Sequence, residues 1–257
     1  MGDTLRHKPS LGNRVSGQHL KHDFEVQHQG SEYLIRPAQS SPPEWMGKIF
    51  NPEALASEGL IEGRASGRAS AWFFRLDRHP LVLRHYCRGG AVAHISHDRY
   101  LWRGLKTTRA WHEIKVLTAL QRLDLPVPAP IGARVVRHGL TYTADIVMRR
   151  IESSQTLADL AVTHHHTDGL PWASIGRTIR RFHDQGVGHA DLNIRNILID
   201  EAGCIWLIDW DRGELQASAR FQARSLVRLQ RSIDKEPALR EAGAQGFAAL
   251  MHAYGES

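Results

Sequence analysis

The chain has 257 residues, of which 42% are hydrophobic and 23% charged, and this length allows one large core or two small lobes around a cleft. It contains no stretch of about 18 apolar residues and no N-terminal apolar run of signal-peptide length, so we expect neither a membrane span nor secretion. The formal net charge of +6 fits an anionic substrate, an anionic membrane surface or a compositional bias.

The basic residues are mostly arginine, since only six of the 33 are lysine. Arginine presents a planar fork that suits phosphate and carboxylate groups. The two cysteines, Cys87 and Cys204, are too few for a disulfide framework, and their sequence neighbours predict buried positions. This cysteine usage predicts a reduced, cytoplasmic compartment.

The first quarter of the chain changes from polar sequence to strand-like sequence. Residues 1–30 are polar and aperiodic, and we expect a mobile N-terminal segment there. From Gly63, the small residues of GRASGRAS precede the apolar runs WFF and LVL. This pattern predicts a strand, a turn and a second strand.

The middle of the chain predicts a helix, two strands and a second helix. Apolar residues recur at steps of three within 98–123, and the proline-rich segment PVPAP ends this helix. Strands are predicted at 131–136 and 141–148, with a turn at Gly139. A further helix over 171–186 has Pro at its start and Gly at its end.

The residues with the clearest chemistry flank a predicted hairpin, in which two short apolar strands surround the turn EAG. The segment GHADLNIRN contains His189, Asp191 and Asn196, and the later segment LIDWDRG contains Asp209. Phosphoryl transfer from ATP needs a carboxylate that orients and deprotonates an acceptor hydroxyl, oxygen ligands for magnesium, and positive charge on the phosphates.

The spacing of these residues matches a kinase catalytic loop, in which an H-x-D precedes an Asn and, across a hairpin, a metal-binding Asp. We therefore predict Asp191 as the base for the acceptor hydroxyl, and Asn196 and Asp209 as magnesium ligands. His189 is predicted to brace the loop through a ring nitrogen, with a proton shuttle as the alternative. A purely structural Asp–Asn–Asp hydrogen-bond network is the alternative for the whole cluster.

The nucleotide side of the site is predicted upstream of this loop. Gly63 and Gly67 fit a loop whose backbone N–H groups approach phosphates, and a plain flexible turn fits equally well. Arg84 stands at the strand position where kinases carry lysine, and Glu113 is its predicted carboxylate partner on the following helix. Asp211 either extends the metal site or pairs with an arginine.

Several segments resemble the bacterial 3-deoxy-D-manno-octulosonic acid (Kdo) kinases, within the lipopolysaccharide-kinase branch of the protein-kinase-like superfamily. These segments are HADLNIRNILID with WLIDWDRG, GRASGRASAWFF, VLRHYCRGGAVAHISHDRYLW and LPVPAPIGA, and the similarity covers about residues 45–235. RHYCRGG and DRYLW are not generic kinase sequence, so they discriminate better than the catalytic loop does.

The resemblance implies an α+β, protein-kinase-like fold of two lobes. We expect an antiparallel-sheet N-lobe that binds the nucleotide over residues 31–150. A mostly helical C-lobe with a short β-hairpin at the active site is expected over residues 151–257, and the mobile segment 1–30 precedes both lobes.

The resemblance also implies an ATP-dependent kinase that uses Mg²⁺ and phosphorylates the 4-hydroxyl of Kdo on a lipid A precursor, in lipopolysaccharide inner-core biosynthesis. Such an enzyme is a peripheral protein at the cytoplasmic face of the bacterial inner membrane. Asp191 matches the family's catalytic Asp, Asn196 and Asp209 match its metal ligands, and Arg84 is at its cation position.

A protein substrate is not expected. No A-P-E signature follows Asp209, and the short remainder of the chain leaves no room for the helical subdomain that docks peptides. Asn193 also stands where Ser/Thr kinases usually have lysine.

One helix is predicted to carry a basic face. The segment ARFQARSLVRLQRSIDK places four arginines on one side: Arg220, Arg224, Arg228 and Arg231. This face either meets anionic lipid headgroups or the acidic glycolipid, or is the solvated outer surface of a core-packing helix.

Two other groups of polar residues have competing interpretations. Arg88, Arg99 and Arg103 either bind the acceptor's carboxylate or solvate the lobe. The triple histidine at 164–166 invites a metal site, but a solvated loop is the preferred interpretation, because no partner stands at helical spacing.

Three other functions compete with the Kdo kinase hypothesis. An aminoglycoside- or choline-kinase-like phosphotransferase shares the H-x-D-L-x-x-x-N pattern, although RHYCRGG and DRYLW argue against it. A catalytically silent pseudokinase scaffold is supported only by Arg84 in place of lysine. Nucleic-acid binding would explain the charge, but no nucleic-acid motif is present and no such partner is expected.

Overall fold

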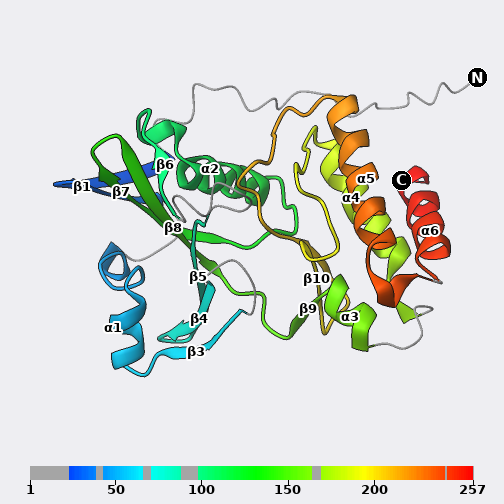
Figure 1. Cartoon of the computed structure of the whole chain (residues 1–257), viewed down its shortest axis with the longest axis horizontal. Coiled ribbons are helices and arrows are strands. Elements are labelled where there is room, and N and C mark those ends of the chain that lie inside the picture. The colour runs from blue at the N-terminus through cyan, green and yellow to red at the C-terminus, as the bar shows by residue number, and fades with distance from the viewer. Residues whose placement is uncertain are drawn as a thin grey trace, which may run out of the picture.

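The computed structural model describes residues 23–38, 43–65, 71–87, 98–163, 169–240 and 242–256. They form two lobes, with the sheet and two helices at the left of Figure 1 and the remaining helices at the right. The N-lobe elements are β1 (Phe24–Gln29), β2 (Glu32–Pro37), α1 (Pro52–Ser57), β3 (Ile61–Arg64), β4 (Ala71–Leu76), β5 (His79–His85), β6 (Tyr100–Leu101), α2 (Arg109–Arg122), β7 (Pro130–His138) and β8 (Thr141–Arg149).

The C-lobe is mostly helical and contains one small sheet. Its elements are β9 (Ser154–Thr156), α3 (Leu157–Thr163), α4 (Trp172–Asp184), β10 (Ile197–Asp200), β11 (Ile205–Leu207), α5 (Ala219–Asp234) and α6 (Gly243–Gly255). The sheet has the order β11-β10-β9, so the predicted hairpin is present as β10 and β11.

The N-lobe sheet has the order β1-β2-β7-β8-β5-β4-β3, with β6 paired to β8, and all of these pairs are antiparallel. The predicted strand pairs β4–β5 and β7–β8 are confirmed, and Gly139 takes the positive φ of 64° that the β7–β8 turn needs. The predicted α+β, two-lobed architecture is confirmed.

The two faces of the N-lobe sheet pack against different partners. On one face, Ile146 of β8 joins α2 and the C-lobe in a single large hydrophobic cluster. On the other face, the next residue, Val147, joins a smaller cluster with α1 and residues 45–50. Adjacent strand residues point to opposite faces, which explains why neighbours in sequence belong to separate clusters.

Two predicted boundaries differ from the structure. The sheet starts at Phe24, ahead of the expected boundary at residue 31, because β1 pairs with β2 along its whole length. The helix predicted over 98–123 begins only at Arg109, where the side chain of Thr108 caps it by accepting from the Trp111 N–H at 3.3 Å. The preceding residues form β6 and a short 3₁₀ helix.

The prediction that both cysteines are buried is wrong. Cys204 is exposed and Cys87 is half-buried, and both are free thiols. Cys204 comes directly after the turn of the β10–β11 hairpin, where the chain faces solvent. In the part of the chain that the structure describes, no helix combines the length and the hydrophobicity needed to cross a bilayer.

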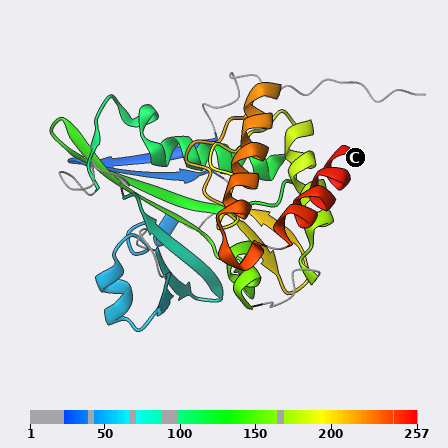
Figure 2. The same cartoon turned by 45° about the vertical axis from the view of Figure 1, so that its right-hand side comes forward.

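Helix α4 leads into the predicted catalytic loop and packs closely on α6. A Cβ atom on Gly176 would lie 2.1 Å from the Leu250 carbonyl oxygen, so the two helix backbones almost touch there. Gly186, with φ 71°, then turns the chain out of α4 toward the loop that begins at Gly188. Figure 2 shows α4, α5 in orange and α6 in red side by side in the C-lobe.

Candidate active site

An arginine whose side chain is 16% exposed links the two lobes. Arg84 of β5 forms an ion pair through Nη2 with Glu113 of α2, and its Nη1 donates to Asp209 Oδ1 at 2.5 Å. The side chain of Glu113 is fully buried, and that of Asp209, which follows β11, is 34% exposed. The predicted Arg84–Glu113 pair is therefore present, and it extends across the cleft to the predicted metal ligand.

Glu113 makes two further hydrogen bonds. Tyr86 Oη donates to its Oε2 at 2.5 Å, and the backbone N–H of Trp210 donates to its Oε1 at 3.3 Å. Tyr86 comes two residues after Arg84, so both side chains leave the chain on the same side. The carboxylate of Glu113 thus holds β5, α2 and the segment after β11 in one arrangement.

The charges in this cluster control each other's protonation. Burial raises the pKa of Glu113, and the positive charge of Arg84 opposes that rise. Burial also favours protonated Asp209, but Arg84 outweighs this effect and leaves the pKa of Asp209 below its usual value. Although burial works against its charge, the two carboxylates hold the pKa of Arg84 well above its usual value.

His189 braces the catalytic loop through both ring nitrogens. Its Nε2 lies 2.8 Å from the Ile208 carbonyl oxygen, and its Nδ1 lies 3.1 Å from the backbone N–H of Asp191. These partners fit the neutral tautomer that donates from Nε2 and accepts at Nδ1. Burial lowers the pKa of His189, which favours the same neutral form.

Two asparagines fix the backbone of the catalytic loop. Nδ2 of Asn196 donates to the carbonyl oxygen of Asp191 at 2.9 Å, and Nδ2 of Asn193 donates to the same oxygen at 2.8 Å. The backbone N–H of Ile208 donates to the Asn196 carbonyl oxygen at 3.0 Å. The loop is therefore tied to the segment that carries Asp209. The bond to Asp191 uses the side-chain nitrogen of Asn196 and not its side-chain oxygen.

The side chain of Asp191 reaches toward solvent and toward helix α5. It is 53% exposed, and its Oδ1 lies 3.6 Å from Nη1 of Arg228, whose side chain is 56% exposed. The carboxylate is thus accessible to an incoming hydroxyl group.

The backbone after β11 has an unusual conformation at Asp209, the predicted metal ligand. Asp209 has a φ of 68°, in the left-handed region that non-glycine residues seldom adopt. Asp211 forms an ion pair with Arg109 at the start of α2, so the prediction of an ion pair with an arginine is confirmed. Arg109 also donates to Tyr100 Oη at 2.8 Å, which connects β6 to this segment.

Other predicted site residues lie apart from this cluster or outside the described residues. Gly63 is part of β3, opposite Phe73 of β4. Gly67, Arg88 and the triple histidine at 164–166 lie outside the described residues. Arg99 and Arg103 are exposed next to β6.

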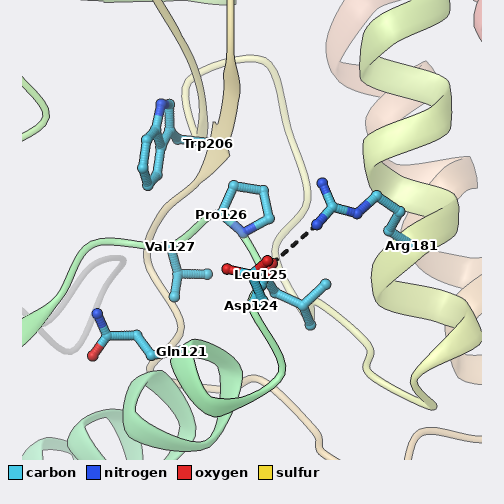
Figure 3. Close-up of a pocket in the computed structure, with 7 residues that line it drawn as sticks. All are labelled: Gln121, Asp124, Leu125, Pro126, Val127, Arg181 and Trp206. Atoms are coloured by element: carbon cyan, nitrogen blue, oxygen red, sulfur yellow. Dashed lines mark hydrogen bonds between the residues drawn. The ribbon is translucent and has the colours of Figure 1, made fainter.

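One pocket is lined by residues from α2, α4, β11 and the segment after α2. It is enclosed by the end of α2 with the chain that follows, by α4 and by β11, as Figure 3 shows. Arg181 points to the Asp124 carbonyl oxygen there and donates to it at 2.9 Å, and Trp206 lies on the opposite side. None of the predicted catalytic or metal-binding residues lines this pocket.

Sequence reasoning missed three residues that complete the site. Tyr86 could have been found, because it stands two residues after Arg84 in a predicted strand and therefore on the same face. The positions of Arg109 beside Asp211 and of Arg228 beside Asp191 depend on how helices pack, and no local pattern encodes that.

Comparison with known proteins identifies the family. A sequence profile described as "Lipopolysaccharide kinase (Kdo/WaaP) family" matches residues 53–254, which include both lobes. The chain belongs to the lipopolysaccharide kinase (Kdo/WaaP) family. Membership in the Kdo/WaaP family makes it a kinase, an enzyme that transfers phosphate from ATP, and so confirms the predicted phosphotransferase activity.

Curated relatives in the Kdo/WaaP family share much of the sequence. The chain is 46% identical over 209 residues to the 3-deoxy-D-manno-octulosonic acid kinase of Stenotrophomonas maltophilia (strain K279a), covering 80% of this chain and 83% of the relative. It is 41% identical over 215 residues to the enzyme of the same name from Xylella fastidiosa (strain M23), covering 82% of each. The predicted resemblance to Kdo kinases is therefore confirmed.

A solved structure, WaaP in complex with acyl carrier protein, shares the fold of this Kdo/WaaP family member. Its TM-score is 0.54 at 13% sequence identity, with coverage of 85% of this chain and 88% of that chain. This similarity confirms the kinase-like fold.

The donor set of the site fits a magnesium nucleotide. In the described part of the chain, no group of three or more His, Cys, Asp or Glu side chains is arranged to hold a metal. An Asn–Asp pair such as Asn196 and Asp209 suits Mg²⁺, which usually takes one or two carboxylates together with phosphate oxygens and waters. Nε of Arg84 is buried and has no hydrogen-bond partner among the described residues, so this guanidinium retains a donor for a phosphate oxygen.

Proposed function

We propose that this kinase transfers the γ-phosphate of ATP to the 4-hydroxyl of a Kdo residue on a lipid A precursor. The observation that carries the proposal is the exposed carboxylate of Asp191, held by a braced loop beside the cluster of Arg84, Glu113 and Asp209. Curated relatives with the name 3-deoxy-D-manno-octulosonic acid kinase support the choice of acceptor.

In this proposal each residue has one task. Asp191 accepts the proton of the acceptor hydroxyl, whose oxygen forms a bond to the γ-phosphorus. The bond from that phosphorus to the bridging oxygen breaks, and ADP leaves with the electron pair. His189 keeps the loop of Asp191 in place and exchanges no proton, because backbone groups occupy both of its ring nitrogens.

The remaining residues would hold the nucleotide. Arg84 neutralises phosphate charge and is kept in position by Glu113. Asn196 and Asp209 would bind Mg²⁺, which supplies charge neutralisation on the phosphates.

A transfer assay tests the proposal. The purified protein is incubated with Mg-ATP and a Kdo-bearing lipid A precursor, and the lipid is analysed by mass spectrometry. We expect the mass of one phosphate to be added to the Kdo unit by the wild type and not by Asp191→Asn. The matched control is Asp184→Asn, because Asp184 is an exposed residue on α4 that pairs with Arg180.

The outcome separates the candidate acceptors. No transfer to Kdo combined with phosphorylation of a free sugar or an aminoglycoside would replace the acceptor and keep the chemistry. No transfer to any acceptor and no ATP binding would favour a pseudokinase. Full activity of Asp191→Asn would rule out Asp191 as the base.

We also propose that the basic face of α5 holds the enzyme against an anionic membrane, the cytoplasmic side of the inner membrane. Arg220, Arg224, Arg228 and Arg231 are all exposed on this helix, and the neighbouring Val227 is 45% exposed. Each basic residue near an anionic bilayer contributes about 1 kcal/mol to binding. An acceptor with a lipid anchor would be reached more readily from a membrane-bound position.

Vesicle binding tests this localisation. Reversing two charges, Arg220→Glu with Arg224→Glu, is expected to weaken binding to phosphatidylglycerol vesicles by about 30-fold or more. Arg177→Glu with Arg240→Glu is the control with the same change in net charge at exposed positions elsewhere. Equal binding by both double variants would remove the proposed role of α5.

A further inference from the structure

Helix α5 forms a wall beside the catalytic loop. The backbone N–H of Ile194 donates to Ser232 Oγ at 3.2 Å, so the loop and the helix are joined through a hydrogen bond. One turn before Ser232, Arg228 lies beside Asp191, with 3.6 Å between Nη1 and Oδ1. The side chain nearest to the proposed base from this helix is therefore a cation.

The contact between Arg228 and Asp191 differs from a structural ion pair. A charge-assisted N–H···O bond spans about 2.7–2.9 Å, so the observed separation of 3.6 Å is too long for one. Both side chains are also more than half exposed, at 56% and 53%, and such exposed pairs contribute little to stability. The two groups lie close together and yet keep their hydrogen-bonding capacity.

The surrounding helix offers little else to neutralise this cation. Arg224 and Arg231 stand one turn before it and one turn after it, and like charges at these spacings repel each other. A cation placed beside other cations and an exposed carboxylate is suited to receive an anionic ligand.

We propose that Arg228 binds the carboxylate of the sugar-acid acceptor while Asp191 accepts the proton of its hydroxyl. The inference rests on the proposed Kdo kinase function. In Kdo, the carboxylate is attached to C2 and the 4-hydroxyl to C4 of the same ring, so one sugar carries both groups at 1,3-related positions. The neighbouring cation and carboxylate of the enzyme match this pair.

Arg228 is therefore a specificity-determining residue for the acceptor. In this role it exchanges no proton and binds the acceptor, not the nucleotide. A neutral sugar could reach Asp191 but would leave Arg228 without its ligand. The enzyme would thus distinguish a sugar acid from a neutral sugar by one charge-assisted contact.

Steady-state kinetics with the full-length chain test this inference. The acceptor is a Kdo-bearing lipid A precursor in neutral detergent micelles, which exclude a contribution from an anionic membrane. Arg228→Gln is expected to lower kcat/KM for this acceptor by about 10- to 100-fold, mainly through KM. KM for ATP stays constant, and Arg228→Lys restores part of the loss. The control is Arg177→Gln, an exposed arginine of α4.

The carboxylate itself is tested with its methyl ester. The wild type should lose activity on the ester by the same factor by which Arg228→Gln lowers activity on the acid. Arg228→Gln should be equally active on the ester and on the acid. If esterification lowers the activity of Arg228→Gln as much as that of the wild type, Arg228 binds another anion, such as a lipid A phosphate, and the inference is overturned. If the wild type is active and Arg228→Gln has an unchanged KM for the acceptor, the role of Arg228 is overturned and the proposed function stands. If the wild type is inactive on the Kdo-bearing acceptor, the proposed function is overturned as well.

Discussion

The buried carboxylate of Glu113 should contribute more to stability than any surface acid of this protein. Its side chain is fully buried and binds Arg84, Tyr86 Oη and the backbone N–H of Trp210. Glu113→Gln keeps the shape of the side chain, removes the negative charge and replaces one acceptor oxygen by an NH2 donor. The substitution therefore leaves the largely buried guanidinium of Arg84 with one carboxylate partner fewer.

The expected loss of stability depends on the partners that the guanidinium of Arg84 retains. Breaking a buried ion pair by removing one partner costs about 3–5 kcal/mol. Arg84 retains Asp209, whose side chain is only partly exposed, so the lower end applies and we expect about 3 kcal/mol. For a chain of this size, that loss corresponds to a fall in Tm of roughly 6–12 °C.

The measurement is urea and thermal unfolding followed by circular dichroism, with the same slope m required for both proteins. Glu62→Gln is the matched control, because Glu62 makes exposed ion pairs with Arg75 and Arg150 and should change stability little. Equal losses in the two variants would refute the reasoning, since burial would then have no influence on the cost.

Three other predictions concern pH, the catalytic loop and helix packing. Burial lowers the pKa of His183 to about 4, while the unfolded chain binds a proton at about pH 6.5. Its contribution to stability should therefore be complete above about pH 6.5 and decline toward pH 4, and denaturation of His183→Gln across this range should lack that decline. His189→Ala should lower kcat by about 100-fold through misplacement of Asp191. The Kd for ATP and the shape of the pH–rate profile should stay unchanged, and loss of an ionisation near neutral pH would indicate a proton shuttle instead. Gly176→Ala should destabilise the protein by about 1–3 kcal/mol, because its Cβ would meet the Leu250 carbonyl oxygen. Gly169→Ala, with open space around the added methyl group, should leave Tm nearly constant.

The parts of the site that depend on local sequence were predictable. Asp191, Asn196 and Asp209 were located by their spacing around a hairpin, and the hairpin is present as β10 and β11. The Arg84–Glu113 pair followed from one strand and one helix with a single acidic residue, and it is present too. Whether these residues carry out the proposed chemistry remains a prediction.

Features that depend on packing were not predictable from local patterns. The start of α2 was placed too early, because the sequence periodicity continues before the cap at Thr108. Cys204 was expected to be buried from its neighbours, but the strand end that carries it faces solvent. The contact of Arg228 with Asp191 required knowledge of where α5 crosses the catalytic loop.

The large hydrophobic cluster does not stop at the boundary between the lobes. It includes Ile146 of the N-lobe sheet, Ile114 of α2 and Ile175 of α4, so one core runs through both halves. The two lobes should therefore melt in one cooperative transition, and neither half is expected to fold when expressed alone. The smaller cluster around Phe50 and Val147 lies on the opposite face of the sheet and is separate from this core. It is the natural place for a partial opening that leaves the catalytic loop intact.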